Sequence, residues 1–276
     1  MKYIGIDLGG TNVRAGLVEN GHLTGIRESM IKQGGSEEEI IGQIFNVIDR
    51  LNCDSPVGIG MGVPSVVDVE KGIVYDVVNI PSWKEVHVKE IFEKRYSIPV
   101  HVNNDANCFA MAEYHFGKGK GTKSMIGLIM GTGMAGGIII NGKPYEGANC
   151  GAGEFGMIQY LDHYLEYYSS GQFFSNIHKT TGVEVAGKAL AGNPSAIAMM
   201  EEFGGHVGKA IAAILYAYDP QKIILGGSVS KSYHLFKEAL WKELENFAFR
   251  PVIKNLVIEV SELNHPGVLG AAALCI

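Results

Sequence analysis

The chain has 276 residues and a formal net charge of −6, and 46% of its residues are hydrophobic. A chain of this length can bury one large core or two compact ones. The negative charge disfavours binding to nucleic acid or to anionic membranes. Its four cysteines lie far apart with no CxxC spacing, which favours a reducing cytoplasm over a disulfide framework. No apolar run reaches about 18 residues and no signal-peptide pattern is present, so neither secretion nor a membrane span is predicted.

The first part of the chain predicts two hairpins and then alternating helices and strands. Apolar strands at 3–8 and 13–18 flank a glycine-rich turn, and Asn20-Gly21 predicts a second turn into a strand near 22–31. Ser36 followed by Glu39 is a capping-box pattern, which predicts a helix from Glu37 to about Leu51. Further predicted elements are a strand at 57–63, a hairpin at 66–74, a helix at 86–95, a strand at 99–105 and a helix from Ala106 to about Tyr114.

The second half begins like the first. A strand at 124–130 leads into a glycine-rich tip at 131–137 and a return strand at 138–143 that ends in an Asn-Gly turn. This internal repeat predicts two related α/β lobes. Beyond it the sequence predicts a helix at 195–218, a strand at 222–227, a helix at 231–247, a strand at 256–260 and a final helix from Gly267.

Three groups of glycines follow predicted strands, and they are candidate phosphate-binding turns. Backbone N–H groups in such turns can hold phosphate oxygens, because no Cβ blocks the approach, and a threonine hydroxyl adds a donor. Asp7 could lie near a phosphate-bound Mg²⁺ or cap the turn, and each tip could also be a plain hairpin turn. The candidate nucleotide-binding residues are Asp7, Gly9, Gly10, Thr11, Asn12, Gly131, Thr132, Gly133, Gly226 and Gly227.

Ordered motifs along nearly the whole chain resemble those of the ROK family, which groups bacterial sugar kinases with sugar-responsive repressors. The motifs are DLGGTNVR (7–14), GVPSVVD (62–68), NIPSW (79–83), NNDANCFAMAE (103–113), GTGMAGGIIINGK (131–143), GANCGAGEFG (147–156) and ILGGSVS (224–230). The resemblance implies an actin/hexokinase-like ATPase fold with two RNase H-like halves and the active site in the cleft between them. We expect an N-terminal lobe at 1–104, completed by a C-terminal helix at 265–276, and a C-terminal lobe at 105–264.

The resemblance also implies roles for individual residues. Asp105 matches the family's catalytic base, which accepts the proton of a sugar hydroxyl as that oxygen attacks the γ-phosphate of ATP. Asn104 and Glu154 match sugar ligands, and Glu166 matches the second sugar-binding glutamate. Ser65 is a further candidate for the sugar pocket. The alternatives are a helix-capping Asp105, a turn amide at Asn104 and a solvated Glu166.

One departure from the family pattern concerns its zinc site. Met157 stands where the family has a zinc-binding histidine, and residues 160–166 contain none of the cysteines that supply the other ligands. Structural zinc sites are usually built from imidazole and thiolate ligands, and the site that the resemblance implies is of this kind, so we expect no structural metal here. His163 is then a surface or packed histidine, and the tyrosine-rich run at 160–168 is expected to replace the metal by aromatic packing.

The resemblance implies an ATP- and Mg²⁺-dependent kinase that phosphorylates a hexose or N-acetylhexosamine at its primary hydroxyl. Glucose, N-acetylmannosamine, fructose and allose stay open as substrates. A repressor is disfavoured, because family repressors carry a helix-turn-helix domain before the kinase-like part and DLGGT begins here at residue 7. A catalytically silent sugar-binding protein is the remaining alternative. We expect a cytoplasmic homodimer that binds sugar and ATP and binds neither nucleic acid nor membrane.

Overall fold

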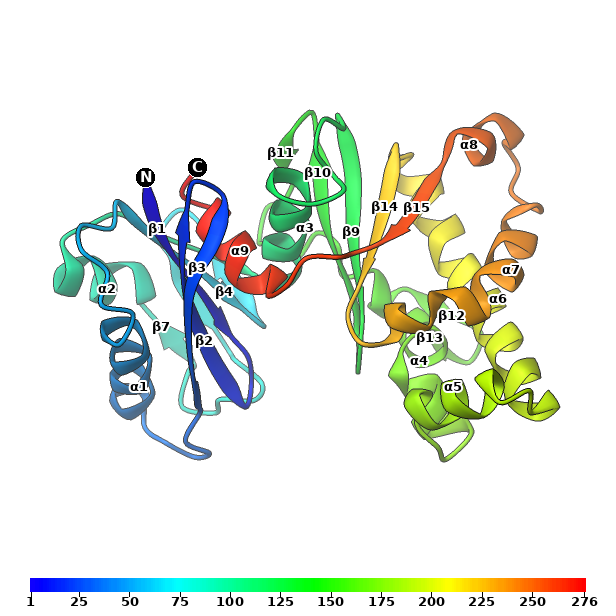
Figure 1. The fold of residues 1–276 in the computed structure, drawn as a ribbon, viewed down its shortest axis with the longest axis horizontal. Coiled ribbons are helices and arrows are strands. Elements are labelled where there is room, and N and C mark those ends of the chain that lie inside the picture. Colours follow the sequence, from blue (N-terminus) through cyan, green and yellow to red (C-terminus); the bar gives the residue numbers. More distant parts are fainter. The chain divides into compact units, whose positions relative to one another are not determined.

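The computed structural model describes residues 1–276, which form two compact units (Figure 1). Unit 1 consists of Met1–Gly121, Gly137–Ala152 and Glu262–Ile276, and unit 2 consists of Thr122–Gly136 and Gly153–Ser261. The boundaries of these units differ from those of the predicted lobes. Helix α3 (Asp105–His115) belongs to unit 1, because it packs against α9 (Pro266–Ala273). The boundary between residues 104 and 105 stays a prediction.

Unit 1 contains a five-stranded sheet in the order β3-β2-β1-β4-β8. Strands β1, β2 and β3 are antiparallel neighbours, whereas β4 and β8 run parallel to β1. The turn between β2 and β3 is made by Asn20 and Gly21, whose φ angles of 52° and 80° are those of a type I′ hairpin turn. The strands are β1 (Lys2–Leu8), β2 (Asn12–Glu19), β3 (His22–Met30), β4 (Gly58–Val63) and β8 (Val100–Asn104).

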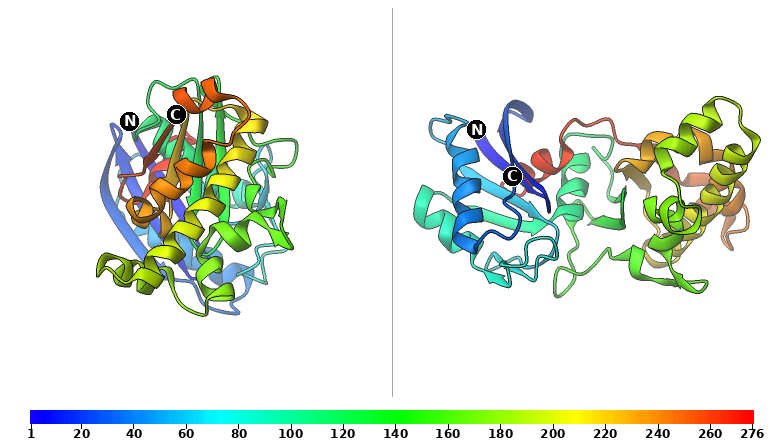
Figure 2. Two further views of the ribbon diagram at one scale, coloured as in Figure 1. Left: turned by 90° about the vertical axis from the view of Figure 1, so that its right-hand side faces the viewer. Right: turned by 90° about the horizontal axis from the view of Figure 1, so that it is seen from below.

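Helices cover both faces of this sheet (Figures 1 and 2). On one face α1 (Glu37–Asp49) and α2 (Val88–Tyr96) share a core with the alternating side chains of β1, such as Ile4 and Ile6. On the other face α9 lies directly on β1 and β4. A Cβ at Gly5 would lie 2.0 Å from the Val268 carbonyl oxygen, and one at Gly60 would lie 1.7 Å from that of Ala271. These two paired glycines therefore let α9 approach the sheet closely.

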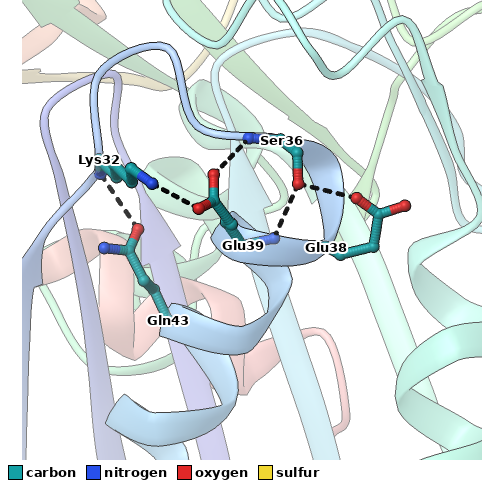
Figure 3. Close-up of polar contacts among 5 residues, drawn as sticks. All are labelled: Lys32, Ser36, Glu38, Glu39 and Gln43. Atoms are coloured by element: carbon teal, nitrogen blue, oxygen red, sulfur yellow. Dashed lines mark hydrogen bonds and ion pairs between the residues drawn. The ribbon is translucent and has the colours of Figure 1, made fainter.

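Helix α1 begins as its sequence predicts (Figure 3). The Ser36 Oγ accepts the Glu39 amide at 3.3 Å, and the Glu39 Oε2 accepts the Ser36 amide at 2.9 Å, so the capping box is confirmed. Lys32 forms an ion pair with the Glu39 carboxylate, and its amide donates to Gln43 Oε1 at 3.1 Å. These contacts fix the loop between β3 and α1.

A second five-stranded sheet has the order β11-β10-β9-β14-β15, the same topology as the first. In chain order, β9 and β10 are consecutive and neighbour each other in this sheet. Strand β14 runs parallel to β9, and β15 runs parallel to β14. Asn141 and Gly142 repeat the type I′ geometry, with φ angles of 52° and 77°. The predicted repeat of two related α/β halves is thereby confirmed. The strands are β9 (Ser124–Met130), β10 (Met134–Ile140), β11 (Lys143–Pro144), β14 (Lys222–Gly226) and β15 (Val257–Val260).

The predicted glycine tip at 131–137 is too long, because β10 already begins at Met134. Gly136 and Gly137 lie inside the strand and serve close packing. A Cβ at Gly136 would lie 2.6 Å from the Phe155 ring, and one at Gly137 would lie 2.3 Å from the Ala106 carbonyl oxygen. The tip itself is therefore limited to residues 131–133.

The remaining elements of unit 2 are mostly helical. The long helix α6 packs along α7 (Figure 1), and α5 packs against α6. Neither α5 nor α8 is predicted from the sequence, although Thr181 caps α5 by accepting the Glu184 amide. Their bounds are α4 (Leu165–Ser169), α5 (Gly182–Leu190), α6 (Pro194–Tyr218), α7 (Tyr233–Leu244) and α8 (Arg250–Asn255), with short strands β12 (Gln159–Tyr160) and β13 (His163–Tyr164).

Three short strands complete unit 1 as a separate antiparallel sheet: β5 (Val66–Asp68), β6 (Ile73–Tyr75) and β7 (Glu85–Val86). None of the helices is both long and apolar enough to span a lipid bilayer.

Candidate functional site

The candidate residues of unit 1 lie along one edge of its sheet. Asp7 of β1 pairs with Gly62 of β4, and Gly62 pairs with Asn103 of β8. These three strands are parallel, so the segments that follow them leave from the same edge. Ligands of open α/β sheets bind at such carboxyl ends. The structure thus gathers the first glycine turn, Ser65 and the Asn104–Asp105 junction at one side of unit 1.

The first glycine turn, Gly9 to Asn12, is held by its neighbours. The Gly9 amide donates to the Asn12 carbonyl at 2.9 Å, which closes the turn. The loop fixed by the α1 capping box contacts it, because Gln33 Nε2 donates to the Gly10 carbonyl at 3.3 Å. On its other side Asn79 of the NIPSW segment packs on Gly10, where a Cβ would lie 2.3 Å from the Asn79 Cβ. Only glycine fits at this position.

Asp7 lies against the amino end of α9. A Cβ at Gly267 would lie 2.7 Å from the Asp7 Cγ, and the Arg14 guanidinium is 3.9 Å from an Asp7 oxygen. Burial raises the pKa of Asp7, while the charges of Arg14 and His265 oppose that rise. The carboxylate thus lies at the positive end of a helix and beside the first glycine turn.

Asn104 and Asp105 form the junction between β8 and α3. Asn104 is the N-cap of α3, because its Oδ1 accepts the Ala106 amide at 2.8 Å, and its Nδ2 donates to the Ser65 carbonyl at 3.3 Å. Asp105 is the first residue of the helix, and its Oδ1 also approaches the Ala106 amide at 2.9 Å. The Asn104 amide therefore has a structural role, yet it retains one N–H and one lone pair for a ligand.

A buried amide network supports this junction, and the sequence did not predict it. Asn103 donates to Glu146 Oε1 at 2.6 Å, and Asn107 donates to Asn103 Oδ1 at 2.9 Å. The Cys150 thiol contacts the same Asn103 oxygen at 3.4 Å. Because Asn103 and Asn107 are about 1–2% exposed, they need these partners. The spacing of the two asparagines across a strand-to-helix junction was the available signal.

Ser65 follows β4, and its hydroxyl donates to the Tyr75 carbonyl of β6. The hydroxyl proton is thus committed within the protein, so Ser65 can offer a ligand only its oxygen lone pairs.

In unit 2 the second and third glycine turns lie side by side. They follow the neighbouring parallel strands β9 and β14, in which Gly226 pairs with Ile129. Gly227 has a φ of 83°, and a Cβ there would lie 2.3 Å from the Met130 carbonyl oxygen. The Gly171 amide donates to the Gly131 carbonyl at 2.7 Å, which ties the second turn to the start of the next segment.

A pocket of about 350 Å³ opens beside these two turns. Its lining comes from four separate stretches of unit 2, and none of its lining side chains is charged. No sequence pattern predicts this pocket, because tertiary packing assembles it from distant segments. The lining residues are Gly131, Thr132, Gly171, Gln172, Phe174, Ser175, Thr180, Thr181, Gly182, Val183, Met200, Phe203, Ser228, Val229, Ser232 and Phe236.

The candidate glutamates of unit 2 differ in their surroundings. Glu166 supports the second glycine turn, because its Oε2 accepts the Met134 amide at 2.8 Å and its Oε1 accepts Gln172 Nε2 at 2.6 Å. A Cβ at Gly133 would lie 2.4 Å from the same Oε2. Glu154 accepts no hydrogen bond through its side chain. Burial raises the pKa of Glu154, and the negative charge of Glu166 adds to that rise.

Aromatic side chains fill the region where the family pattern predicts zinc ligands. The Tyr160 hydroxyl lies 3.1 Å from His206 Nδ1, Tyr168 donates to the Asp162 carboxylate, and His163 stacks on Tyr167 with ring centroids 4.0 Å apart. No three histidine, cysteine, aspartate or glutamate side chains converge as a metal site. Absence of structural zinc stays a prediction that metal analysis can test.

Comparison with known sequences gives one family. Residues 3–276 match the ROK family. A glucokinase of Halalkalibacterium halodurans is 28% identical over 311 residues, which cover 99% of this chain and 94% of that protein. An N-acetyl-D-glucosamine kinase of Pasteurella multocida is 30% identical over 305 residues, which cover 99% of each chain. A Caldicellulosiruptor protein is 28% identical over 310 residues, which cover 99% of this chain and 77% of that protein. Its name describes it as a xylose repressor whose role is not established.

Solved structures agree. The crystal structure of a ROK family glucokinase from Streptomyces griseus in complex with glucose and AMPPNP aligns with a TM-score of 0.82 and 26% identity over 99% of each chain. The ROK hexokinase of Thermus thermophilus aligns with a TM-score of 0.81 and 25% identity over 99% of this chain and 97% of that one. The expected actin/hexokinase-like fold with two α/β halves is confirmed.

Proposed function

The chain belongs to the ROK family, and we propose that it transfers the γ-phosphoryl group of ATP to the primary hydroxyl of a hexose or N-acetylhexosamine. The observation that carries this proposal is the uncharged pocket of unit 2, which opens beside two glycine turns. An apolar pocket suits a nucleoside, and glycine turns at the ends of parallel strands suit its phosphates. The names of the glucokinase and N-acetyl-D-glucosamine kinase relatives support both sugar classes.

In the proposed reaction Asp105 is the general base. Its carboxylate accepts the proton of the sugar hydroxyl as that oxygen attacks the γ-phosphorus in line. Phosphoryl transfer depends chiefly on positioning and on stabilising charge, so one well-placed carboxylate is enough. The Asn104 cap and the buried Asn103 network hold the junction that carries this carboxylate.

Asp7 is the residue that we propose to help hold Mg²⁺. Mg²⁺ usually binds through one or two carboxylates together with substrate phosphates and water, and Asp7 offers a partly exposed carboxylate beside the first glycine turn. Partial burial raises the pKa of Asp7 despite the charges of Arg14 and His265, and a bound cation would oppose that rise. When bound with ATP, Mg²⁺ neutralises charge on the phosphates.

Sugar hydroxyls are the proposed ligands of Asn104, Glu154, Glu166 and Ser65. Glu154 suits this role, because it has no hydrogen-bond partner within the protein and a polyol would supply donors to it. Met157 lies three residues further on and is 54% exposed. Its apolar surface would suit the methyl group of an N-acetyl substituent. Glucose, N-acetylglucosamine and N-acetylmannosamine are the first candidates, and fructose and allose follow.

The test is an ATP-consumption assay over these sugars with Mg²⁺, made on the wild type and on Asp105→Asn. We expect turnover on at least one sugar, and a fall in kcat of about 10²- to 10⁴-fold in the variant with sugar binding retained. Asp54→Asn makes the same chemical change on an exposed loop of unit 1 and serves as control. Near-normal turnover by Asp105→Asn would contradict the assignment of the base.

The same assay tests a second candidate, a catalytically silent sugar-binding protein. Sugar binding by calorimetry with no turnover on any sugar would favour it, and the exposed Met157 in place of a polar residue is the observation behind it. A cytoplasmic homodimer stays the expected state, which sedimentation of the purified protein and fractionation of its cells would test.

A further inference from the structure

We propose, on the basis of the proposed kinase function, that the nucleotide pocket of unit 2 does not select among purine bases. GTP and ITP then serve as phosphoryl donors alongside ATP. The pocket would take a purine nucleoside triphosphate as a class.

The first reason is that the lining contains no charged side chain. A carboxylate accepts hydrogen bonds only, and an ammonium or guanidinium group donates only. Groups that are fixed as donor or as acceptor, charged side chains among them, allow a site to reject one base strongly, because the wrong base leaves them unpaired. Adenine and guanine exchange donor and acceptor at the purine 6-position and at N1, and guanine carries an additional 2-amino donor. The lining has no charged group to read this exchange.

The second reason is that the one amide side chain of the lining is already occupied. Gln172 donates to Glu166 at 2.6 Å through its Nε2 and accepts from Asn176 at 3.3 Å through its Oε1. Its orientation is therefore set by the support of the second glycine turn. Turning it toward a base would cost both contacts.

Several hydroxyls and main-chain groups at the rim are occupied as well. Thr181 accepts the Glu184 amide at 3.2 Å, and Thr180 donates to the Glu184 carboxylate at 3.0 Å. The Val185 amide donates to the Thr181 carbonyl, and the Thr180 amide donates to the Phe174 carbonyl, each at 3.0 Å. These contacts fix the start of α5 and occupy the Thr180 and Thr181 hydroxyls and the Thr181 carbonyl.

The hydroxyls left over are those of Thr132, Ser228 and Ser232. A hydroxyl rotates and can either donate or accept, so it satisfies the 6-amino group of adenine and the 6-oxo group of guanine equally. Apolar residues such as Val183 and Val229 favour a large flat base without reading its edge. The phosphates, which the glycine turns would hold, are identical in all donors.

The experiment compares Mg²⁺ complexes of ATP, GTP, ITP and CTP in two readouts on the wild-type protein. One is kcat/KM for sugar phosphate formation, and the other is displacement of a fluorescent mant-ATP probe. We expect GTP and ITP to lie within about tenfold of ATP in both, since one ordinary hydrogen bond is worth roughly that factor. CTP should be weaker than ATP because it buries less apolar surface.

A variant links this behaviour to the pocket. Ser232→Trp places an indole in the pocket, so it should weaken all four nucleotides by a common factor of at least about tenfold while sugar binding is unchanged. Ser195→Trp on the exposed start of α6 lies outside the lining and is the matched control. Weakening of ATP alone in Ser232→Trp would contradict the proposal.

The outcomes separate this inference from the proposed function. Turnover with ATP and a GTP value lower by 100-fold or more would overturn the inference and leave the kinase function standing. Equal displacement by ATP and GTP with no sugar phosphorylated would support the inference and overturn the kinase function. No displacement of mant-ATP by any nucleotide would overturn both.

Discussion

Glu166→Gln tests whether this glutamate supports the nucleotide site as well as the sugar site. In the structure one carboxylate oxygen accepts the Met134 amide at 2.8 Å, and the other accepts Gln172 Nε2 at 2.6 Å. The substitution keeps the shape of the side chain but replaces one acceptor oxygen by an NH₂ group. That group would face a donor whichever way the amide is turned.

The expected magnitude follows from these two contacts. A hydrogen bond to a charged acceptor is worth about 1.5–3 kcal/mol, and the variant loses one such bond and weakens the other. If the second glycine turn must be ordered to bind phosphate, that loss appears as weaker nucleotide binding. With about 1.4 kcal/mol for each factor of ten, the KM for ATP should rise by roughly 10- to 100-fold.

The assay measures KM for ATP at saturating sugar and KM for sugar at saturating ATP, for Glu166→Gln and for the control Glu154→Gln. Because the Glu154 side chain accepts no hydrogen bond from the second turn, its variant should raise the KM for sugar and leave that for ATP within about twofold. An unchanged KM for ATP in Glu166→Gln, with only the sugar constant raised, would refute the supporting role of Glu166.

Three further expectations concern stability and metal content. Gly60→Ala forces α9 away from the sheet, which should cost about 1–3 kcal/mol and lower Tm by roughly 2–12 °C. Gly25→Ala in β3, where a Cβ meets nothing within 4 Å, should leave Tm within about 2 °C, and equal losses in both variants would contradict the packing explanation. The raised pKa of Glu154 means that its ionised form destabilises the folded protein. This loss of stability is absent below the pKa of the unfolded state and grows as the pH rises from there through the pKa of the folded state. Glu154→Gln should therefore raise Tm more at pH 7 than at pH 4, and a larger gain at pH 4 would reverse the sign of this reasoning. Chelation with EDTA should leave Tm unchanged, whereas a drop in Tm together with zinc in elemental analysis would refute the prediction of no structural zinc.

Local signals in the sequence were sufficient for most elements of the fold. Ser36 and Glu39 predict the start of α1, because a capping box involves only residues three positions apart. Asn20-Gly21 and Asn141-Gly142 predict hairpin turns, because both residues of a type I′ turn need positive φ. The apolar pattern at 3–8 predicts β1, which the structure places at Lys2–Leu8. Motif order then predicted the family, which the match over residues 3–276 confirms.

Tertiary structure decided what the individual residues of the site contact. Gly136 and Gly137 look like part of a turn in the sequence, but they lie in β10 because Phe155 and Ala106 pack against them. The motif that contains Glu166 does not reveal whether this side chain faces solvent, a sugar or a glycine turn. Its contacts with Met134 and Gln172 show that it supports the turn. The uncharged pocket of unit 2 left no signal in the sequence, because its lining joins segments far apart along the chain. Turns and helix caps depend on neighbours a few residues away, whereas glycine contacts, buried networks and pockets depend on which distant segments the packed core brings together.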